Sequence, residues 1–165
     1  MLLFRKTTLM FLALILFGSF IFSNLGIAKN LAPSKGIAST NPAYGTGSTS
    51  LSFIIKSTQY LKEGNNYIQL ISDNIVTVGG NTQAYSTVDE IVLALYLQRW
   101  DDANSRWVDV LYIGEFAQFN SSFVNGAKDI TVPKGYYYRT RSYHSILEGG
   151  TLEQMNVYSS YIYVP

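Results

Sequence analysis

The sequence lacks cysteine altogether and has a single histidine among its 165 residues. Without cysteine, the chain has no disulfides, no thiolate metal ligands and no cysteine nucleophile. A zinc site needs three or four histidine, cysteine or carboxylate ligands, and one histidine without cysteine cannot supply a structural site. The composition therefore argues against a metal- or thiol-dependent enzyme, and it predicts no cofactor.

Charge is also scarce, since Asp, Glu, Lys and Arg together make up only 14% of the chain and the formal net charge is +1. Arg5 and Lys6 lie in a segment that we expect to be removed, which leaves ten basic against eleven acidic residues. Nucleic-acid binding needs a basic surface, so no nucleic acid is expected as a partner. Apolar residues reach 47%, which favours a folded core over disorder.

The first 28 residues have the order of a secretory signal peptide. Arg5 and Lys6 provide a basic start, an apolar run covers residues 9–22, and Gly26-Ile27-Ala28 offers small residues before a cut. The run is shorter than the ~20 residues that span a bilayer, so we expect cleavage after Ala28 rather than an uncleaved anchor helix. The sequence predicts a secreted or cell-envelope-associated protein with no membrane segment after cleavage.

Residues 29–50 are predicted to form a flexible tether, because Pro and Gly recur there among Ser, Thr and Asn without an apolar period. From residue 51 onward, strand-like runs alternate with turn residues, and no stretch keeps a helical period. The first predicted strand covers residues 51–56. The strongest one covers residues 90–100 and has four large apolar residues on one face: Ile91, Leu93, Leu95 and Leu97.

This pattern predicts an all-β domain over residues 51–165, with roughly eight strands and turns every ~8–12 residues. We expect an antiparallel β-sandwich that is immunoglobulin-like in its broad architecture. One run, Gly135-Tyr136-Tyr137-Tyr138-Arg139-Thr140-Arg141-Ser142, resembles the penultimate strand of immunoglobulin-like and fibronectin type III domains. The resemblance implies that Tyr136, Tyr138, Thr140 and Ser142 face inward, with Tyr136 as the tyrosine of the tyrosine corner.

Most of the chain from residue 51 also resembles an uncharacterised family of small secreted proteins from Gram-positive bacteria. Four runs carry this resemblance: residues 82–88 (TQAYSTV), 95–100 (LYLQRW), 134–139 (KGYYYR) and 158–164 (YSSYIYV). That family has no assigned activity or catalytic residues. The resemblance therefore implies a fold and an extracellular location, and it implies nothing about chemistry.

His144 is the one side chain that could act as the base of a serine hydrolase, with Ser142 as a neighbour in sequence. No Gly-x-Ser-x-Gly motif is present, so we expect instead a half-buried, hydrogen-bonded histidine near the end of a strand. Paired carboxylates could hydrolyse glycosides, but Asp89 and Glu90 are adjacent on a strand and would point to opposite faces. Asp101 to Ser105 is interpreted as a hairpin loop rather than a calcium site.

One surface feature predicts recognition. If Tyr138, Thr140 and Ser142 face inward, then an aromatic–basic stripe lies on the outer face of the same strand. Its members are Tyr137, Arg139, Arg141 and Tyr143. Tyrosine rings stack on sugar faces, and guanidinium groups bind hydroxyls or carboxylates with fixed geometry. Trp100 and Trp107 flank the hairpin loop and could add a second aromatic surface, or they could pair across the hairpin and close it.

Three function classes remain open. The leading hypothesis is a secreted, non-catalytic binding module for cell-wall or other polysaccharide, or for a protein partner, that uses the stripe and the two tryptophans. The second is a structural protein that self-assembles through an edge strand, predicted at residues 155–164. The third is a hydrolase that uses His144 or two carboxylates.

Overall fold

The computed structural model describes residues 32–50 and 58–165, and it contains no helix in these ranges. The signal peptide predicted at residues 1–28 and the strand predicted at 51–56 lie outside them. The described residues form seven strands, all paired antiparallel: β1 Tyr44–Ser50, β2 Leu61–Ser72, β3 Ile75–Asp101, β4 Arg106–Thr131, β5 Tyr136–Glu148, β6 Thr151–Tyr158 and β7 Ile162–Val164. The all-β, antiparallel prediction is confirmed.

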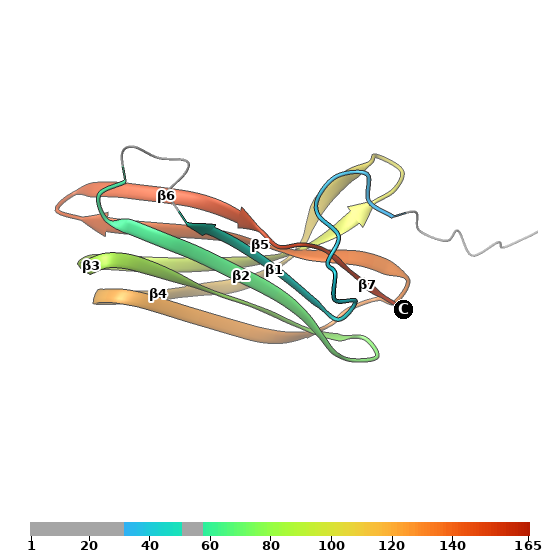
Figure 1. Ribbon diagram of the computed structural model, residues 1–165. Helices are drawn as coiled ribbons and strands as arrows, with labels where there is room; N and C mark the ends of the chain where they lie inside the picture. Colours follow the sequence, from blue (N-terminus) through green and yellow to red (C-terminus); the bar gives the residue numbers. More distant parts are fainter. Residues whose placement is uncertain (1–31, 51–57) are drawn as a thin grey trace, which may run out of the picture.

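The strands belong to one sheet with the order β1-β2-β3-β5-β6, while β4 pairs with β3 and β7 pairs with β5. The first half of β3 pairs with β2 and its second half pairs with β5, so the sheet curls into a half-barrel with two facing layers. Figure 1 shows these layers, with β1 and β2 lying across from β5 and β6. A sandwich of two separate, immunoglobulin-like sheets is not confirmed.

The two longest strands pass from one layer to the other. The pairing register of β3 with β4 shifts between Gln83 and Val88, and Asn120 of β4 has a φ of 50°. Irregularities of this kind bend a strand and increase its twist. β3 and β4 stay paired through the bend. Strand-like runs that the sequence analysis separated at turn residues are therefore joined into two continuous strands. The count is therefore seven rather than the roughly eight predicted.

The predicted tether is wrong for Tyr44–Ser50, which forms β1. This strand pairs with β2 from Tyr44 opposite Gln69 to Ser50 opposite Glu63. Its Gly-, Ser- and Thr-rich sequence buries little apolar surface, so no hydrophobic pattern in the sequence predicts this strand. Backbone hydrogen bonds to β2 hold it in place instead.

The core lies between the two layers. Ile91, Leu93, Leu95 and Leu97 of β3 are at most 1% exposed, as their spacing predicted. Ile68 of β2 and Val78 in the first half of β3 are equally buried on the opposing layer. Burying a large aliphatic side chain stabilises a fold by about 1.5–3 kcal/mol, so the facing rows are the main source of stability.

One side of the half-barrel is closed by contacts between β1 and the connection from β6 to β7. The Ser160 amide donates to the Thr46 carbonyl oxygen at 2.9 Å, and the Thr46 amide donates to Ser160 Oγ at 3.1 Å. This connection also divides the predicted strand at 155–164 into β6 and β7. The segment before β1 joins it too, since the Tyr161 amide donates to the Ile37 carbonyl oxygen at 2.8 Å.

Candidate functional site

From Tyr137 to His144, strand β5 alternates between the outer face and the core. Tyr138, Thr140 and Ser142 are at most 1% exposed, which confirms the inward positions expected for them. Tyr136 is half-buried and packs against the core cluster. The outward positions belong to the aromatic–basic stripe, whose four members are half-buried: Tyr137, Arg139, Arg141 and Tyr143.

The tyrosine-corner role falls to Tyr138 and not to Tyr136. The Tyr138 hydroxyl donates to the Pro133 carbonyl oxygen, five residues upstream, at 2.8 Å. Burial raises the pKa of Tyr138 to about 12, so the hydroxyl keeps its proton and its donor role. The expectation for Tyr136 was wrong because this ring lies at the margin of the core, next to Tyr138, with the guanidinium of Arg99 over it.

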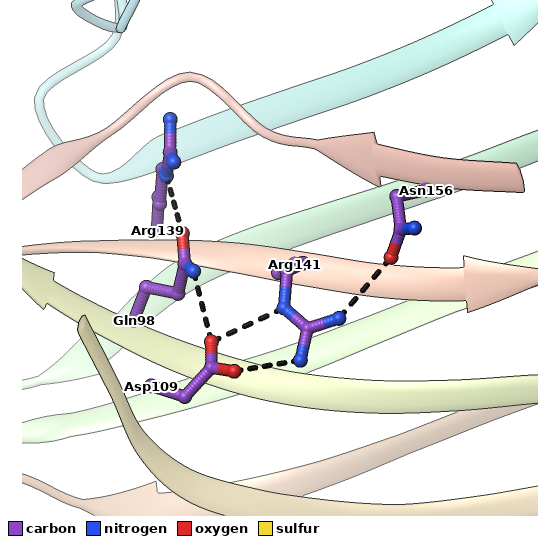
Figure 2. A network of polar contacts seen from close by, with 5 residues as sticks. All are labelled: Gln98, Asp109, Arg139, Arg141 and Asn156. Atoms are coloured by element: carbon purple, nitrogen blue, oxygen red, sulfur yellow. Dashed lines mark hydrogen bonds and ion pairs between the residues drawn. The ribbon is translucent and has the colours of Figure 1, made fainter. Parts of the chain in front are cut away.

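Arg141 is held in place by three partners, two of which, Asp109 and Asn156, bind it through the hydrogen bonds drawn in Figure 2. Its Nη2 and Nε donate to the two carboxylate oxygens of Asp109 at 2.6 and 3.1 Å, and its Nη1 donates to Asn156 Oδ1 at 3.1 Å. The ring of Tyr96 lies under the guanidinium, 3.9 Å away. The hydrogen bond from Arg141 holds the pKa of Asp109 below its usual range, so this pair stays ionised.

Arg139 has a different environment. Its Nε donates to Gln98 Oε1 at 2.7 Å, and Gln98 Nε2 donates in turn to Asp109 Oδ1 at 2.8 Å (Figure 2). Its guanidinium carbon lies 4.5 Å from the ring centre of Trp107 and 4.6 Å from that of Tyr158. Burial lowers the pKa of Arg139 to about 10, which still leaves it charged at neutral pH.

Ring contacts extend this network in both directions. Tyr112 packs on Tyr96 with centroids 5.1 Å apart, and Tyr161 joins Trp107 to Tyr137 at 5.6 and 5.7 Å. We call the connected surface the aromatic–basic face. It consists of Tyr96 and Gln98 from β3, Trp107, Asp109 and Tyr112 from β4, Tyr137, Arg139 and Arg141 from β5, Asn156 and Tyr158 from β6, and Tyr161 and Tyr163 from the C-terminal segment.

The structure brings together four of the six predicted contact residues and separates two. Trp100 is only 5% exposed and packs edge-on against Trp107, its partner across the hairpin, at 5.4 Å. The pairing alternative therefore holds for Trp100, which offers no ligand surface. Tyr143 lies further along β5, where its hydroxyl donates to Gln154 Oε1. Trp107 joins the face, and its Nε1 donates to the Lys35 carbonyl oxygen at 2.7 Å.

Several members of the face were not predicted as contact residues from the sequence. Asp109, Tyr112 and Tyr158 lie far from β5 in sequence and reach it through strand pairing. The signal that could have found them is register, because Gln98 lies opposite both Asp109 and Arg139, and Arg141 lies opposite Tyr158. No periodicity within a single strand reports such pairings.

A hollow of about 480 Å³ lies at the C-terminal end of the face, between β7 and the segment that precedes β1. Tyr137, Tyr161 and Tyr163 belong to both the face and the hollow, and Pro42 and Leu70 complete its wall. The side chains that line it are apolar or aromatic except for Ser39. It can accept an apolar group or the carbon–hydrogen face of a sugar next to the stripe.

His144 is fully buried rather than half-buried as expected, and hydrogen bonds hold both of its ring nitrogens. Nδ1 lies 2.7 Å from Thr82 Oγ1, and Nε2 lies 2.7 Å from Ser142 Oγ. The Thr82 hydroxyl donates to the Val92 carbonyl oxygen, so it accepts from Nδ1–H, and Nε2 accepts from Ser142. Burial lowers the pKa of His144 to about 4, and the imidazole is neutral.

Within residues 32–50 and 58–165, no three His, Asp or Glu side chains gather closely enough to hold a metal ion. In the same part of the chain, no helix has the length and apolar character needed to cross a membrane.

The fold and the face define a small all-β protein that presents stacked aromatic rings and guanidinium groups on one surface. The chain belongs to a family of unknown function (DUF6147), whose model matches residues 39–161. No curated protein and no solved structure matches it. The match confirms the expected membership of an uncharacterised family, while a Gram-positive source and secretion stay predictions.

Proposed function

We propose that this protein is a secreted, non-catalytic module that binds cell-wall or other polysaccharide through the aromatic–basic face. The observation that carries the proposal is the continuity of the face, in which rings and planar polar groups lie side by side across β3, β4, β5, β6 and β7. Tyr112, Tyr158 and Tyr163 are 52%, 47% and 39% exposed and supply ring surface at its centre and both sides.

The chemistry of the face suits a carbohydrate. The carbon–hydrogen faces of sugars are apolar and stack on aromatic rings, while their hydroxyls need planar donors and acceptors beside those rings. Asp109, Arg141 and Asn156 provide such groups and are held rigidly by their mutual hydrogen bonds. A preorganised surface loses little side-chain entropy when a ligand binds, which favours affinity.

The hydrolase alternative has weaker support. Ser142 and His144 are within hydrogen-bonding distance, as a nucleophile and base would be, but both are 0% exposed and no substrate reaches them. Asp109 is held ionised by Arg141, so it is a poor general acid. A retaining or inverting glycosidase needs one carboxyl that is protonated near neutral pH.

Sedimentation with insoluble cell-wall material tests the proposal. We expect the purified protein to pellet with the wall and to stay soluble without it. Tyr112→Ala and Tyr163→Ala should each weaken binding about 5- to 30-fold, because a stacked ring contributes on the order of 1–2 kcal/mol. Tyr85→Ala is the matched control, since Tyr85 is 61% exposed but lies at the bend of β3, outside the face.

The pattern across the variants decides between the explanations. Equal losses in all three tyrosine variants would indicate nonspecific adhesion and refute the face as the site. A protein that stays soluble with wall and with every polysaccharide offered would end the proposal. Pelleting without wall would support self-assembly, the second candidate function.

The second candidate function is self-assembly. We propose β4 as the edge strand that would pair with another copy, in place of the C-terminal strand predicted from the sequence. Among the described residues β4 pairs with β3 alone, so one edge of this 26-residue strand is open. Phe119 and Phe123, which are 68% and 47% exposed, lie on it close to the bend. An open edge with apolar side chains is a template for pairing with another chain.

A further inference from the structure

We propose that Arg139 is an oxyanion-binding point in the aromatic–basic face, and that the polysaccharide bound there carries carboxylate or phosphate groups. The inference rests on the proposed function, because it assumes a polysaccharide ligand and adds the sign of its charge. It is carried by the surroundings of Arg139, which, unlike Arg106 and Arg141, has no acidic partner among the described residues.

Arg139 has no acidic partner in the part of the chain that the structure describes. The ion pairs among the described residues join Arg106 to Asp101, Lys134 to Asp73 and Arg141 to Asp109, and none includes Arg139. Its only hydrogen bond within residues 32–50 and 58–165 runs from Nε to the neutral amide oxygen of Gln98. Among the same residues, the four N–H donors of the two Nη groups have no hydrogen-bond acceptor.

The guanidinium is nevertheless fixed in position. The rings of Trp107 and Tyr158 lie 4.5 and 4.6 Å from its central carbon, and Gln98 anchors its Nε side. Gly36 lies at the other end, where an added Cβ would come within 3.3 Å of Nη1. The backbone at Gly36 therefore packs close to this end of the guanidinium and helps to fix it.

Electrostatics favours an anion at this point. Burial lowers the pKa of Arg139, so the protein holds a positive charge that has lost part of its hydration without gaining a counter-charge. The nearest carboxylate, that of Asp109, is already neutralised by two hydrogen bonds from Arg141. An arriving oxyanion would meet one uncompensated positive charge.

The geometry selects a planar or tetrahedral oxyanion next to a sugar ring. Two N–H groups on the outer edge of a guanidinium match two oxygens of a carboxylate or phosphate, and this paired contact is stronger than a neutral hydrogen bond. Tyr158 and Tyr161 supply ring surface beside it for the sugar that carries the anion. A uronic acid residue and a phosphodiester-linked polyol both have this chemistry.

Binding to three immobilised polymers tests the inference: polygalacturonate, the same polymer fully methyl-esterified, and poly(glycerol phosphate). The ester keeps the sugar backbone and removes the charge. We expect the protein to bind at least one charged polymer ten times or more tighter than the ester. A carboxylate ligand predicts a preference for polygalacturonate, and a phosphate ligand predicts one for poly(glycerol phosphate).

Variants at position 139 assign the preference to this side chain. Arg139→Gln should abolish it, with a loss of roughly 10- to 100-fold on the charged polymer that is much larger than the loss on the ester. Arg139→Lys keeps the charge, the stem and the packing but loses the planar fork, and should retain only part of the preference. Lys62→Gln removes one exposed charge from β2, away from the face, and should retain all of it.

The outcomes separate this inference from the proposed function. Equal binding of charged polymers and ester by the unmodified protein would overturn the inference and leave polysaccharide binding intact. A preference that survives in both Arg139 variants would also overturn it, since another cation would then be responsible. If the protein binds neither the polymers nor the cell wall, the proposed function fails and the inference fails with it.

Discussion

Among single residues, His144 shows most clearly how burial sets chemistry. Asn66 donates to Ser142 Oγ at 2.8 Å, Ser142 donates to His144 Nε2, and His144 Nδ1 donates to Thr82. In this series of hydrogen bonds each hydroxyl and the ring N–H donates once, so the imidazole must be neutral. Protonation would place the second proton of the ring on Nε2, facing the hydroxyl that already donates to it, in a site without water access.

We predict that His144 makes the protein acid-sensitive. Its pKa is about 4 in the folded state and 6.5 in an unfolded chain, so the unfolded state binds more protons between these values. The stabilisation is fully present above pH 6.5 and is lost as the pH falls towards 4, by up to about 3 kcal/mol. Urea unfolding at pH 7.5, 6, 5 and 4 measures this loss.

The control for this prediction is His144→Gln, which cannot titrate. Its free energy of unfolding is expected to be lower at pH 7.5 but to change less between pH 6.5 and 4. Carboxylates such as Asp109, whose pKa is lowered, lose their stabilisation at more acidic pH in both proteins. Parallel pH profiles for the two proteins would show that the histidine does not contribute.

Tyr138 provides a second prediction for a single side chain. Tyr138→Phe removes the hydroxyl that donates to Pro133 and should lower the free energy of unfolding by about 1 kcal/mol. Tyr136→Phe, two positions earlier on the same strand, removes a hydroxyl at the margin of the core and should change it by less than about 0.5 kcal/mol. Thermal unfolding compares them, and a larger effect at Tyr136 would contradict the assignment of the tyrosine corner.

Among the elements, β4 has the least usual arrangement, because a long strand with an open edge carries an exposed lysine on the same side of the sheet as the buried Val78. Lys128 pairs with Val78, which is fully buried, so both lie on the inner face of the sheet. The Lys128 ammonium reaches across to the Ile113 carbonyl oxygen at 2.8 Å. A charge that points inward from an edge strand opposes pairing with a second chain.

We therefore predict that Lys128→Val increases self-association. The substitution removes the charge and leaves an apolar, β-branched residue on the open edge, which favours strand pairing. Sedimentation velocity should show dimers or larger species at concentrations where the unmodified protein shows fewer. Lys62→Val on β2, a strand paired on both edges, is the control. A monomeric Lys128→Val protein would argue against β4 as an assembly edge.

At the scale of the whole molecule, closure depends on how closely β1 approaches the β6–β7 connection. Gly47 of β1 packs against the Tyr158 backbone, and a Cβ added there would lie 2.6 Å from Asn66 Oδ1 and clash with the Tyr158 carbonyl. Two backbones can approach this closely only where one of them has no side chain. We call this contact between β1 and residues 158–160 the seam. It connects the start of the described chain with its last strands.

Gly47→Ala should open this seam. The neighbouring atoms belong to backbone and to a buried asparagine, so they can yield only by moving strands, at a cost of about 1–3 kcal/mol. Differential scanning calorimetry should show a lower Tm, and amide exchange in β1 and in residues 159–161 should speed up. Ser48→Ala, at the next, exposed position, should leave both measurements nearly unchanged.

Much of the fold was accessible from patterns within single strands. Alternation identified the buried row of β3 and the inward side of β5, since side chains on a strand point to opposite faces in turn. The same alternation placed Tyr137, Arg139 and Arg141 together on the outside. It failed for β1, where hydrogen bonds rather than apolar side chains hold the strand, and for Trp100, whose exposure depends on its partner.

The sequence by itself determined the all-β class, the two sides of β5 and the absence of thiol chemistry, because composition and period-two patterns act within a few residues of chain. Only the tertiary structure decided which strands meet at the aromatic–basic face, that Asp109 neutralises Arg141 while Arg139 has no carboxylate partner among the described residues, and that His144 is sealed from water. These properties follow from strand register and from the bend in β3 and β4, which bring together residues separated by dozens of positions.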